Sequence, residues 1–377
     1  MRKYLLLFSL LWGQALAQIS PEDFIADFES GNIHNVQQVG VDSFTFEIRL
    51  DDNHGDLHGW YYFAIAGNQG RTATLFLTNP DGWQNSNCNP VISPDNTNWG
   101  RVQDVWGQSG WLCFRQYLVA DTIWFAQVFP FTVSRMDSYL DSIETSPFLM
   151  RQTLGYSVHD RPIDMVTITD DFYPAEFKKT AYLISRQHPM ESPPTFILTG
   201  LIDMVLDDSD FADYFRRDIM LKVVPIVNVD GVAEGYSRHN VNGINLNRNW
   251  QPDIENEQPA VRVVHRNIDD YILAGNRIDL FMDLHAAPDF SDFGFRMSEG
   301  YTSSPYYENQ GTFLHLLETY DPWQESWRWR DLDTSYAYGV SCVIMFDMYN
   351  LDALTTENPW TRRNNNSFIN IQSLYNQ

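Results

Sequence analysis

The segment from Asn228 to Trp250, "NVDGVAEGYSRHNVNGINLNRNW", guides the interpretation of the whole chain. It directly follows "MLKVVPIV" (220–227), an apolar run typical of a buried strand. The segment carries Arg238, Asn247 and Arg248. Their planar guanidinium and amide groups suit the binding of oxygen anions, because a guanidinium fork matches the two oxygens of a carboxylate. The segment therefore predicts an anion-binding loop at the end of a strand.

The chain around this segment alternates between strand patterns and helix patterns. Two further apolar runs typical of buried strands are "TAYLIS" (180–185) and "RIDLFMDL" (277–284). Helical patterns occupy "RMDSYLDSIE" (135–144), "TFILTGLIDMVL" (195–206), "SDFADYFRR" (209–217) and "PAVRVVHRNIDDYILAG" (259–275), and a hairpin is predicted around "HDRP" (159–162). This alternation predicts that residues 136–377 form an α/β domain with a mixed, largely parallel sheet.

Two histidines and a glutamate lie just beyond predicted strands. His188 and Glu191, in "HPME", follow the run 180–185, and His285 follows the run 277–284. Ligands of open α/β sheets gather at the carboxyl ends of the strands. Two histidines and one carboxylate with an open fourth position suit zinc. Alone, the HxxE spacing also fits a polar surface turn, but the three residues together predict one Zn²⁺ per chain.

The order of these motifs resembles a known family. HPxE is followed by NxDGxxxGxxR, then LNRNW, then a strand that ends in DLH, as in the zinc carboxypeptidases, the M14 metallopeptidases. The first half of the chain resembles the amino-terminal domain of the cytosolic carboxypeptidase branch through "FESGNI" (28–33), "WYYFAIAG" (60–67) and "FAQVFPFT" (125–132). The resemblance implies a carboxypeptidase-like α/β/α domain preceded by a β-rich domain.

The resemblance also implies a role for each of the polar residues. The two histidines and Glu191 would hold zinc, and Arg238 would polarise the scissile carbonyl group. Asn247 and Arg248 would bind the terminal carboxylate of a peptide with a free carboxyl terminus. A zinc-bound water and a general base would then hydrolyse the last peptide bond. The expected activity is that of a zinc metallocarboxypeptidase.

The general base is where this chain departs from the family. The resemblance places a glutamate near the end of a late strand, eight residues after a glycine. Counting from Gly339 in "GVSCVIMFD" leads to Asp347, which predicts a strand there and a base one methylene shorter than usual. The other interpretation is an aspartate that caps a loop. A second departure is Asn245, which stands where the family often has aspartate and would accept a hydrogen bond from a ligating histidine.

Residues 18–135 show a different pattern. "SFTFEIRL" (43–50) alternates apolar and polar residues, and further short apolar runs follow between clusters of Gly, Asn, Asp and Pro. Short strands separated by turn signals predict a β-sandwich domain.

The first 17 residues have the pattern of a signal peptide. Arg2 and Lys3 precede an apolar run from Tyr4 to Trp12, and "ALA" (15–17) offers a cleavage site. The pattern predicts a secreted or periplasmic protein, with a retained anchor as the alternative. No later run is long and apolar enough to predict a membrane span in the mature chain. The net charge of −24 argues against nucleic acid as a partner.

The sequence leaves open the state of the three cysteines and the role of Arg296. Cys88 and Cys113 could form a disulfide, whereas Cys342 lies in an apolar run typical of a buried thiol. Arg296, in "FGFRM", could select acidic side chains or could be a solvated residue at a strand end.

Two other functions fit the same residues. A zinc amidase that trims peptidoglycan peptides would suit an exported protein. A binding protein on a peptidase scaffold would suit the replacement of the family's glutamate by Asp347.

Overall fold

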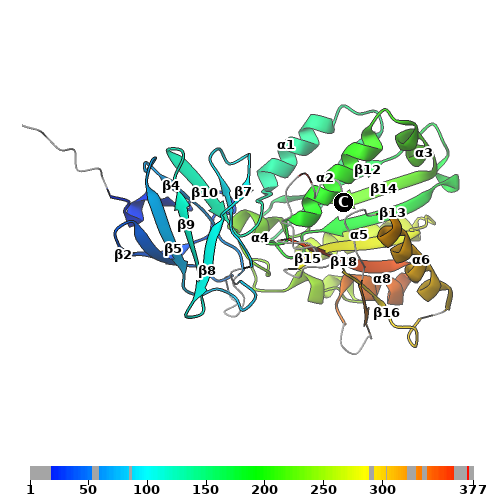
Figure 1. The fold of residues 1–377 in the computed structure, drawn as a ribbon. Helices are drawn as coiled ribbons and strands as arrows, with labels where there is room; N and C mark the ends of the chain where they lie inside the picture. Colours follow the sequence, from blue (N-terminus) through cyan, green and yellow to red (C-terminus); the bar gives the residue numbers. More distant parts are fainter. Residues whose placement is uncertain are drawn as a thin grey trace, which may run out of the picture.

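The computed structural model describes residues 18–52, 59–84, 87–287, 293–302, 304–320, 328–332, 338–360 and 372. They form a β-rich domain and an α/β domain that lie side by side (Figure 1). The proposed signal peptide at 1–17 lies outside the described residues, so export stays a prediction. None of the helices described here has the length and apolar character needed to cross a bilayer.

The β-rich domain consists of two five-stranded sheets. One has the order β1 (Phe24–Ile25), β4 (Tyr62–Ala66), β10 (Thr122–Ala126), β6 (Val91–Ser93) and β7 (Gly100–Arg101). The other has the order β2 (His34–Gly40), β3 (Ser43–Glu47), β5 (Thr72–Leu77), β9 (Trp111–Tyr117) and β8 (Asp104–Gln108). Aromatic residues from both sheets, among them Phe46, Phe63 and Phe114, are fully buried in one shared cluster. The sandwich predicted from the alternation is confirmed.

The α/β domain is built on an eight-stranded mixed sheet. Its order is β11 (Leu149–Tyr156), β12 (Pro162–Ile168), β14 (Ile219–Val224), β13 (Lys179–Ser185), β15 (Leu280–Ala287), β18 (Ala353–Pro359), β16 (Phe293–Met297) and β17 (Arg328–Leu332). The central strands β14, β13, β15 and β18 are all parallel to their neighbours within this group. Their carboxyl ends therefore meet at one edge, which is where ligands of such sheets bind.

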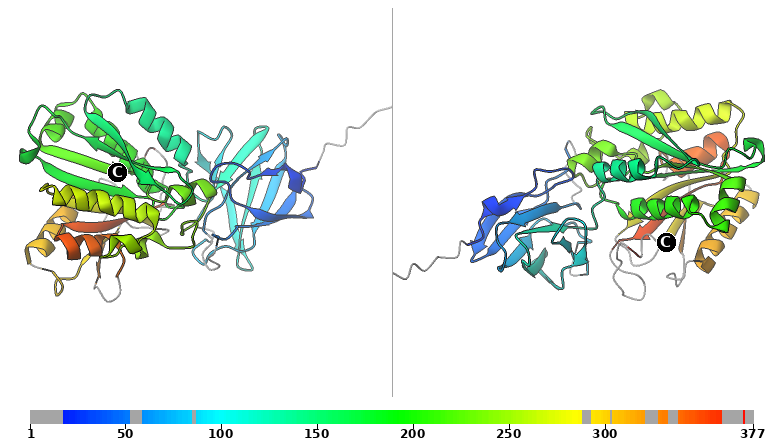
Figure 2. Two further views of the ribbon diagram at one scale, coloured as in Figure 1. Left: turned by 180° about the vertical axis from the view of Figure 1, so that it is seen from behind. Right: turned by 90° about the horizontal axis from the view of Figure 1, so that it is seen from above.

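Helices cover both faces of this sheet. They are α1 (Val133–Ile143), α2 (Pro193–Leu206), α3 (Asp210–Asp218), α4 (Val229–Glu234), α5 (Pro259–Leu273), α6 (Ser304–Tyr320) and α8 (Ser341–Tyr349). Figure 2 shows α2 and α6 over one face and α5 and α8 over the other. The predicted helices within 135–275 and the α/β/α architecture are confirmed.

The strand predicted at 339–347 is wrong, because this segment forms helix α8. A continuous apolar run fits a buried helix as well as a buried strand. The helix begins after Gly339, whose φ is +87° and whose Cβ, if present, would lie 2.6 Å from the carbonyl oxygen of Arg248. It ends at Asn350, which adopts a left-handed conformation with φ +53°. The late strand expected after Gly339 is instead β18, a few residues further on.

The cysteines do not crosslink the β-rich domain. Cys88 and Cys113 are both described and buried, and no disulfide joins them. The thiol of Cys88 instead lies 3.2 Å from the carbonyl oxygen of Trp83. Cys342 is buried in α8 as a thiol, as its apolar surroundings predicted.

Candidate active site

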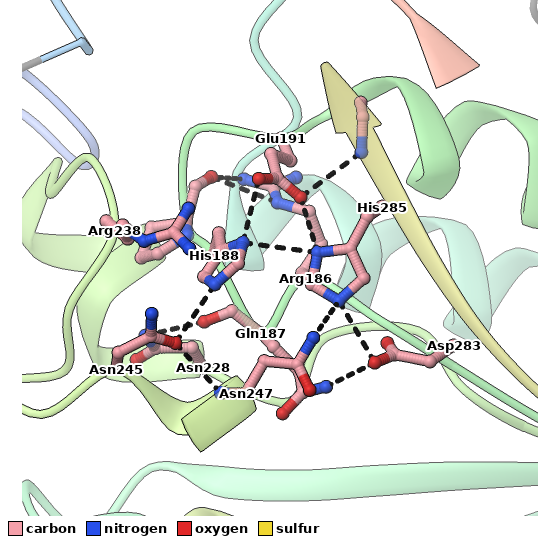
Figure 3. A network of polar contacts seen from close by, with 12 residues as sticks. Arg186, Gln187, His188, Glu191, Asn228, Arg238, Asn245, Asn247, Asp283 and His285 are labelled. Carbon is pink, nitrogen blue, oxygen red and sulfur yellow. Dashed lines mark hydrogen bonds and ion pairs between the residues drawn. The ribbon is translucent and has the colours of Figure 1, made fainter. Parts of the chain in front are cut away.

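The turn after β13 brings the first two predicted ligands into the protein interior. Arg186 follows the strand with φ +58°, a conformation that reverses the chain direction. Its buried guanidinium donates hydrogen bonds to the carbonyl oxygens of Pro189, at 3.0 Å, and Phe131, at 3.1 Å. These bonds shape the turn so that His188 and Glu191 both point toward β15 (Figure 3).

The three predicted ligands meet at the carboxyl edge of the sheet. Glu191 Oε1 lies 2.8 Å from His188 Nδ1, and Glu191 Oε2 lies 2.8 Å from His285 Nδ1. The two Nδ1 atoms are 3.1 Å apart, and all three side chains are buried. Zinc bonds of ~2.0–2.1 Å in a tetrahedron would separate the donors by ~3.3 Å. The donor set and its spacing therefore fit a zinc ion.

In the absence of a metal, the pKa directions of the three residues favour a proton on His285, one of the predicted ligands. Burial and the nearby Arg238 lower the pKa of His188 to about 4, so its imidazole is neutral. Burial alone would raise the pKa of Glu191, but the two histidines outweigh it and lower that pKa. Burial opposes a charge on His285, yet the carboxylates of Asp283 and Glu191 together raise its pKa well above the usual value. A metal must displace this proton from His285.

Hydrogen bonds on the far side of each imidazole hold the ligands in place. His188 Nε2 lies 3.1 Å from the amide oxygen of Asn245, which confirms the expected partner. His285 Nε2 lies 3.0 Å from Asp283 Oδ2. That oxygen also accepts hydrogen bonds from the amide of Gln187, at 2.6 Å, and from the hydroxyl of Ser341, at 2.5 Å. Such partners orient the ligand and raise its basicity.

Asp283 was missed in the sequence interpretation, although a local signal existed. It stands two residues before His285 on the same strand. Residues i and i+2 of a strand point to the same face. The negative charge that Asn245 cannot provide beside His188 is thus provided by Asp283 beside His285.

A carboxylate that was not predicted faces the cluster from the next strand. Strand β18 pairs in parallel with β15, and its Glu357 lies opposite His285 in the register. Glu357 lines the same cavity as His188. Burial and the negative charge of Glu191 raise the pKa of Glu357 to about 8 in the absence of metal. Its Oε2 atom is buried without a hydrogen-bond partner among the described residues.

The predicted position of Asp347 at the site is wrong. This residue lies on an exposed part of α8 and does not line the cavity. The resemblance placed the base on a strand, eight residues after a glycine, whereas the residues that follow Gly339 form a helix on which Asp347 is exposed. The signal for Glu357 was "ALTTENP" (353–359), a short apolar and β-branched run that closes on Asn-Pro.

The cavity beside the cluster is about 410 Å³ in volume and rich in arginine. Arg238 comes from the loop after α4, and Asn247 and Arg248 from the short 3-10 helix Leu246–Arg248. Asn247 is turned toward the ligands, with Nδ2 3.0 Å from His285 Nε2 and Oδ1 accepting the amide of Ser341 at 3.0 Å. The lining is completed by Phe295, Arg330, Asp331, Leu332, Val340 and Thr355.

Arg296, which the sequence suggested as a selector of acidic side chains, does not line the cavity. Arg296 donates a 2.8 Å hydrogen bond to Asp331 and contacts the hydroxyl of Tyr307. Arg330, on the neighbouring strand β17, lines the cavity instead. The wall of the cavity on this side therefore carries a cation despite the strongly acidic composition of the chain.

The fold and the site define a class of α/β/α metalloproteins in which a buried His₂Glu cluster lies beside an arginine-rich cavity. A family profile described as "Zinc carboxypeptidase" matches residues 136–345. A second, described as "Cytosolic carboxypeptidase N-terminal domain", matches residues 24–128. The chain belongs to the zinc carboxypeptidase family.

Similar proteins include mammalian sequence relatives and bacterial proteins of solved structure. "Cytosolic carboxypeptidase 6" is 27% identical over 317 residues in both Mus musculus and Homo sapiens, which covers 78% of this chain and 58% or 62% of those proteins. The chain thus spans about three-fifths of the length of these relatives. "Putative carboxypeptidase A" from Shewanella denitrificans superposes with a TM-score of 0.82 at 25% identity, covering 93% of this chain and 95% of that one. "Metallo-carboxypeptidase" from Burkholderia cenocepacia has a TM-score of 0.81 at 23% identity, with 93% and 94% covered, and shows the fold alone.

Proposed function

We propose that the protein is a zinc-dependent metallocarboxypeptidase that removes single residues from the carboxyl end of peptides. The observation that carries this proposal is the position of Glu357. It lines the cavity opposite His285, so one carboxylate separate from the ligands faces the place where a metal-bound water would react. A protein that only binds its ligand has no need of such a base.

In the proposed hydrolysis, three residues would bind the metal and a fourth transfers protons. His188, Glu191 and His285 would hold Zn²⁺, which when bound supplies a water of lowered pKa and polarises the carbonyl group. Glu357 accepts the proton of the attacking water and passes it to the leaving amine. Its raised pKa suits the second step, and the charge of a bound metal favours the ionised form needed for the first.

Arginines on the cavity wall bind the negative charges of substrate and transition state. Arg238 lies close enough to the cluster to affect the pKa values of His188 and Glu357 and provides a donor for the developing oxyanion. Arg248, more exposed and also on the cavity wall, binds the terminal carboxylate. This grip orients the last peptide bond over the metal cluster.

The finding of Glu357 weakens the alternative of a binding protein without turnover, because that alternative depended on a replaced base. A zinc amidase acting on peptidoglycan peptides uses the same residues, and the proposed export through residues 1–17 would place it beside that substrate. Incubating zinc-loaded protein with a peptide library and with muropeptides tests both. We expect release of single carboxy-terminal amino acids from the peptides. Release only from muropeptides would favour the amidase, and no release from either would reject the proposal.

Arg248→Ala should weaken productive binding of substrates with a free carboxyl terminus. The loss of a hydrogen bond to a charged group costs about 1.5–3 kcal/mol, measured as a fall in kcat/KM. A peptide with an amidated terminus should be a poor substrate for the native protein and should lose little further with the variant. Equal cleavage of amidated and free peptides by the native protein would contradict the carboxylate grip.

Arg330 should favour release of acidic residues. Its cationic side chain lines the same cavity as Arg248, so a carboxylate on the released side chain gains a partner there. Arg330→Gln should lower kcat/KM for peptides ending in Glu by about 10-fold relative to peptides ending in Leu, equivalent to about 1.4 kcal/mol. Arg115→Gln is the control for the loss of one arginine charge, because Arg115 is exposed on β9 of the β-rich domain and does not line the cavity. An equal change in both variants would contradict a specific role for Arg330.

A further inference from the structure

The loop that carries Arg238 is held by a carboxylate from the β-rich domain. Asp51 is buried, and its Oδ1 accepts the backbone N–H of Ser237 at 2.6 Å. Its Oδ2 accepts the backbone N–H groups of Arg238 and His239, both at 2.8 Å. Three consecutive amides of the α/β domain therefore converge on one side chain of the other domain.

The three N–H groups form an anion-binding nest, and the anion in it is the carboxylate of Asp51. Successive backbone N–H groups that point to one centre attract negative charge. Here the carboxylate of Asp51 fills that centre, and Oδ2 also lies 3.2 Å from His239 Nδ1. A charged acceptor binds amide donors more strongly than a neutral one. The backbone on both sides of Arg238 is therefore fixed relative to the β-rich domain.

The same domain also closes the end of helix α4, which leads into this loop at the junction of the two domains (Figure 1). The last carbonyl groups of a helix need donors from outside it. Ser30 Oγ donates to Val232 at 2.6 Å, Arg49 Nη2 to Glu234 at 2.6 Å, and Asn32 Nδ2 to Gly235 at 2.7 Å. The backbones of the two domains lie so close together here that a Cβ at Gly235 would lie 2.7 Å from the carbonyl oxygen of Ser30.

On its other side the loop contacts the turn that carries two of the predicted ligands. The carbonyl oxygen of Ser237 accepts the backbone N–H of Met190 at 3.2 Å, and Met190 lies between two of the ligands in the sequence. The hydroxyl of Ser237 accepts the backbone N–H groups of Gly59 and Trp60 at 2.8 and 3.0 Å. The loop is thus bonded both to the β-rich domain and to the turn that carries His188 and Glu191.

We infer that Asp51 is a positioning residue for Arg238, so that the β-rich domain completes the active site of the α/β domain. Asp51 does not line the cavity beside the metal cluster. It acts by setting the backbone from which Arg238 extends toward the oxyanion. This inference rests on the proposed hydrolase function. A misplacement of about 1 Å in a catalytic group can cost about 100-fold in rate.

The test uses the full-length, zinc-loaded protein with Asp51→Asn. The side chain keeps its shape but loses its charge, and one of its two acceptor oxygens becomes an amide donor that cannot accept the backbone N–H facing it. We expect kcat to fall about 10- to 100-fold, with KM within about 2-fold and zinc content unchanged. In a double-mutant cycle, Asp51→Asn should have little further effect on kcat once Arg238→Ala is present, because the group that Asp51 positions is then gone.

Tyr236→Phe is the matched control. It removes the hydrogen bond from Tyr236 to Asp52, a contact between the same two segments that leaves the three amides untouched. Its kcat should stay near the native value. If Asp51→Asn does not fold by circular dichroism, Asp51→Glu, which keeps the charge but shifts it by one methylene, takes its place. A kcat for the Asp51 variant equal to that of Tyr236→Phe, or additive effects with Arg238→Ala, would overturn the inference.

A binding measurement separates this inference from the proposed function. A peptide phosphonate with a free carboxyl terminus mimics the oxyanion, and its affinity for zinc-loaded protein is measurable by calorimetry without turnover. Asp51→Asn should weaken that affinity about 10-fold or more. If the native protein cleaves no peptide, the hydrolase proposal fails. The affinity for the phosphonate then still tests whether Asp51 positions Arg238. An unchanged affinity would then overturn the inference as well.

Discussion

Glu357→Gln is expected to abolish measurable turnover while the protein keeps its zinc. Glutamine has the size of glutamate and still fits opposite His285, but it cannot accept a proton from the attacking water. A positioned general base contributes about 10²–10⁴-fold to the rate. Because Glu357 is not among the three clustered donors, metal analysis of the variant should still find one zinc per chain. The measurements are kcat on a peptide with a free carboxyl terminus and the zinc content of the same sample.

Asp347→Asn provides the matched control for this result. The resemblance predicts Asp347 as the base, but the residue is exposed on α8. Its replacement should leave kcat within about 2-fold of the native value, as is usual for a surface substitution away from special features. A native rate for Glu357→Gln together with an inactive Asp347→Asn would reverse the assignment. Loss of zinc in Glu357→Gln would instead show that Glu357 serves as a ligand.

The second large effect is expected from removal of a metal ligand. His188→Ala or His285→Ala leaves two of the three donors and should remove most of the zinc and, with it, the activity. The loss of affinity should exceed the ~10–100-fold that removal of an outer partner costs. Asp283→Asn supplies that graded comparison, since Asp283 contacts His285 on the side away from the cluster. Competition with a chelator of known affinity measures all three variants on one scale.

His315→Ala is the control for nonspecific effects of losing a histidine, because His315 is exposed on α6. Its zinc affinity should match that of the native protein. Full zinc content in both His188→Ala and His285→Ala would contradict the metal site. If Asp283→Asn lost as much affinity as His285→Ala, then Asp283 would have to be counted as a ligand.

Local patterns in the sequence were enough to predict both domains and the three residues that meet in the His₂Glu cluster. Alternation with period two in "SFTFEIRL" indicated a half-buried strand, and β3 has that pattern of burial. His188 and Glu191 lie three residues apart, and His285 ends an apolar run, so short segments contain the information that places them. The carboxyl ends of parallel strands meet at one edge, which brings β13 and β15 together without further detail.

The general base could not be identified in this way. The run 342–346 is continuously apolar, and such a run is compatible with helix or strand. The choice depends on packing against the rest of the α/β domain and on the close approach of Gly339 to Arg248. Only the pairing of β18 with β15 then determines which residue lies opposite His285.

By itself, then, the sequence determined a β-rich half followed by an α/β half, and it placed His188, Glu191 and His285 just beyond predicted strands, because strand and helix patterns depend on the periodicity of neighbouring residues. The carboxypeptidase-like α/β/α architecture was implied only by the resemblance of the motif order to a known family. The tertiary structure decided the rest. Glu357 faces the cluster through strand register, and Asp51 reaches the loop of Arg238 from another domain, 187 residues away in the sequence. Contacts at such separations leave no periodic signal, since they arise only when complete elements pack against one another.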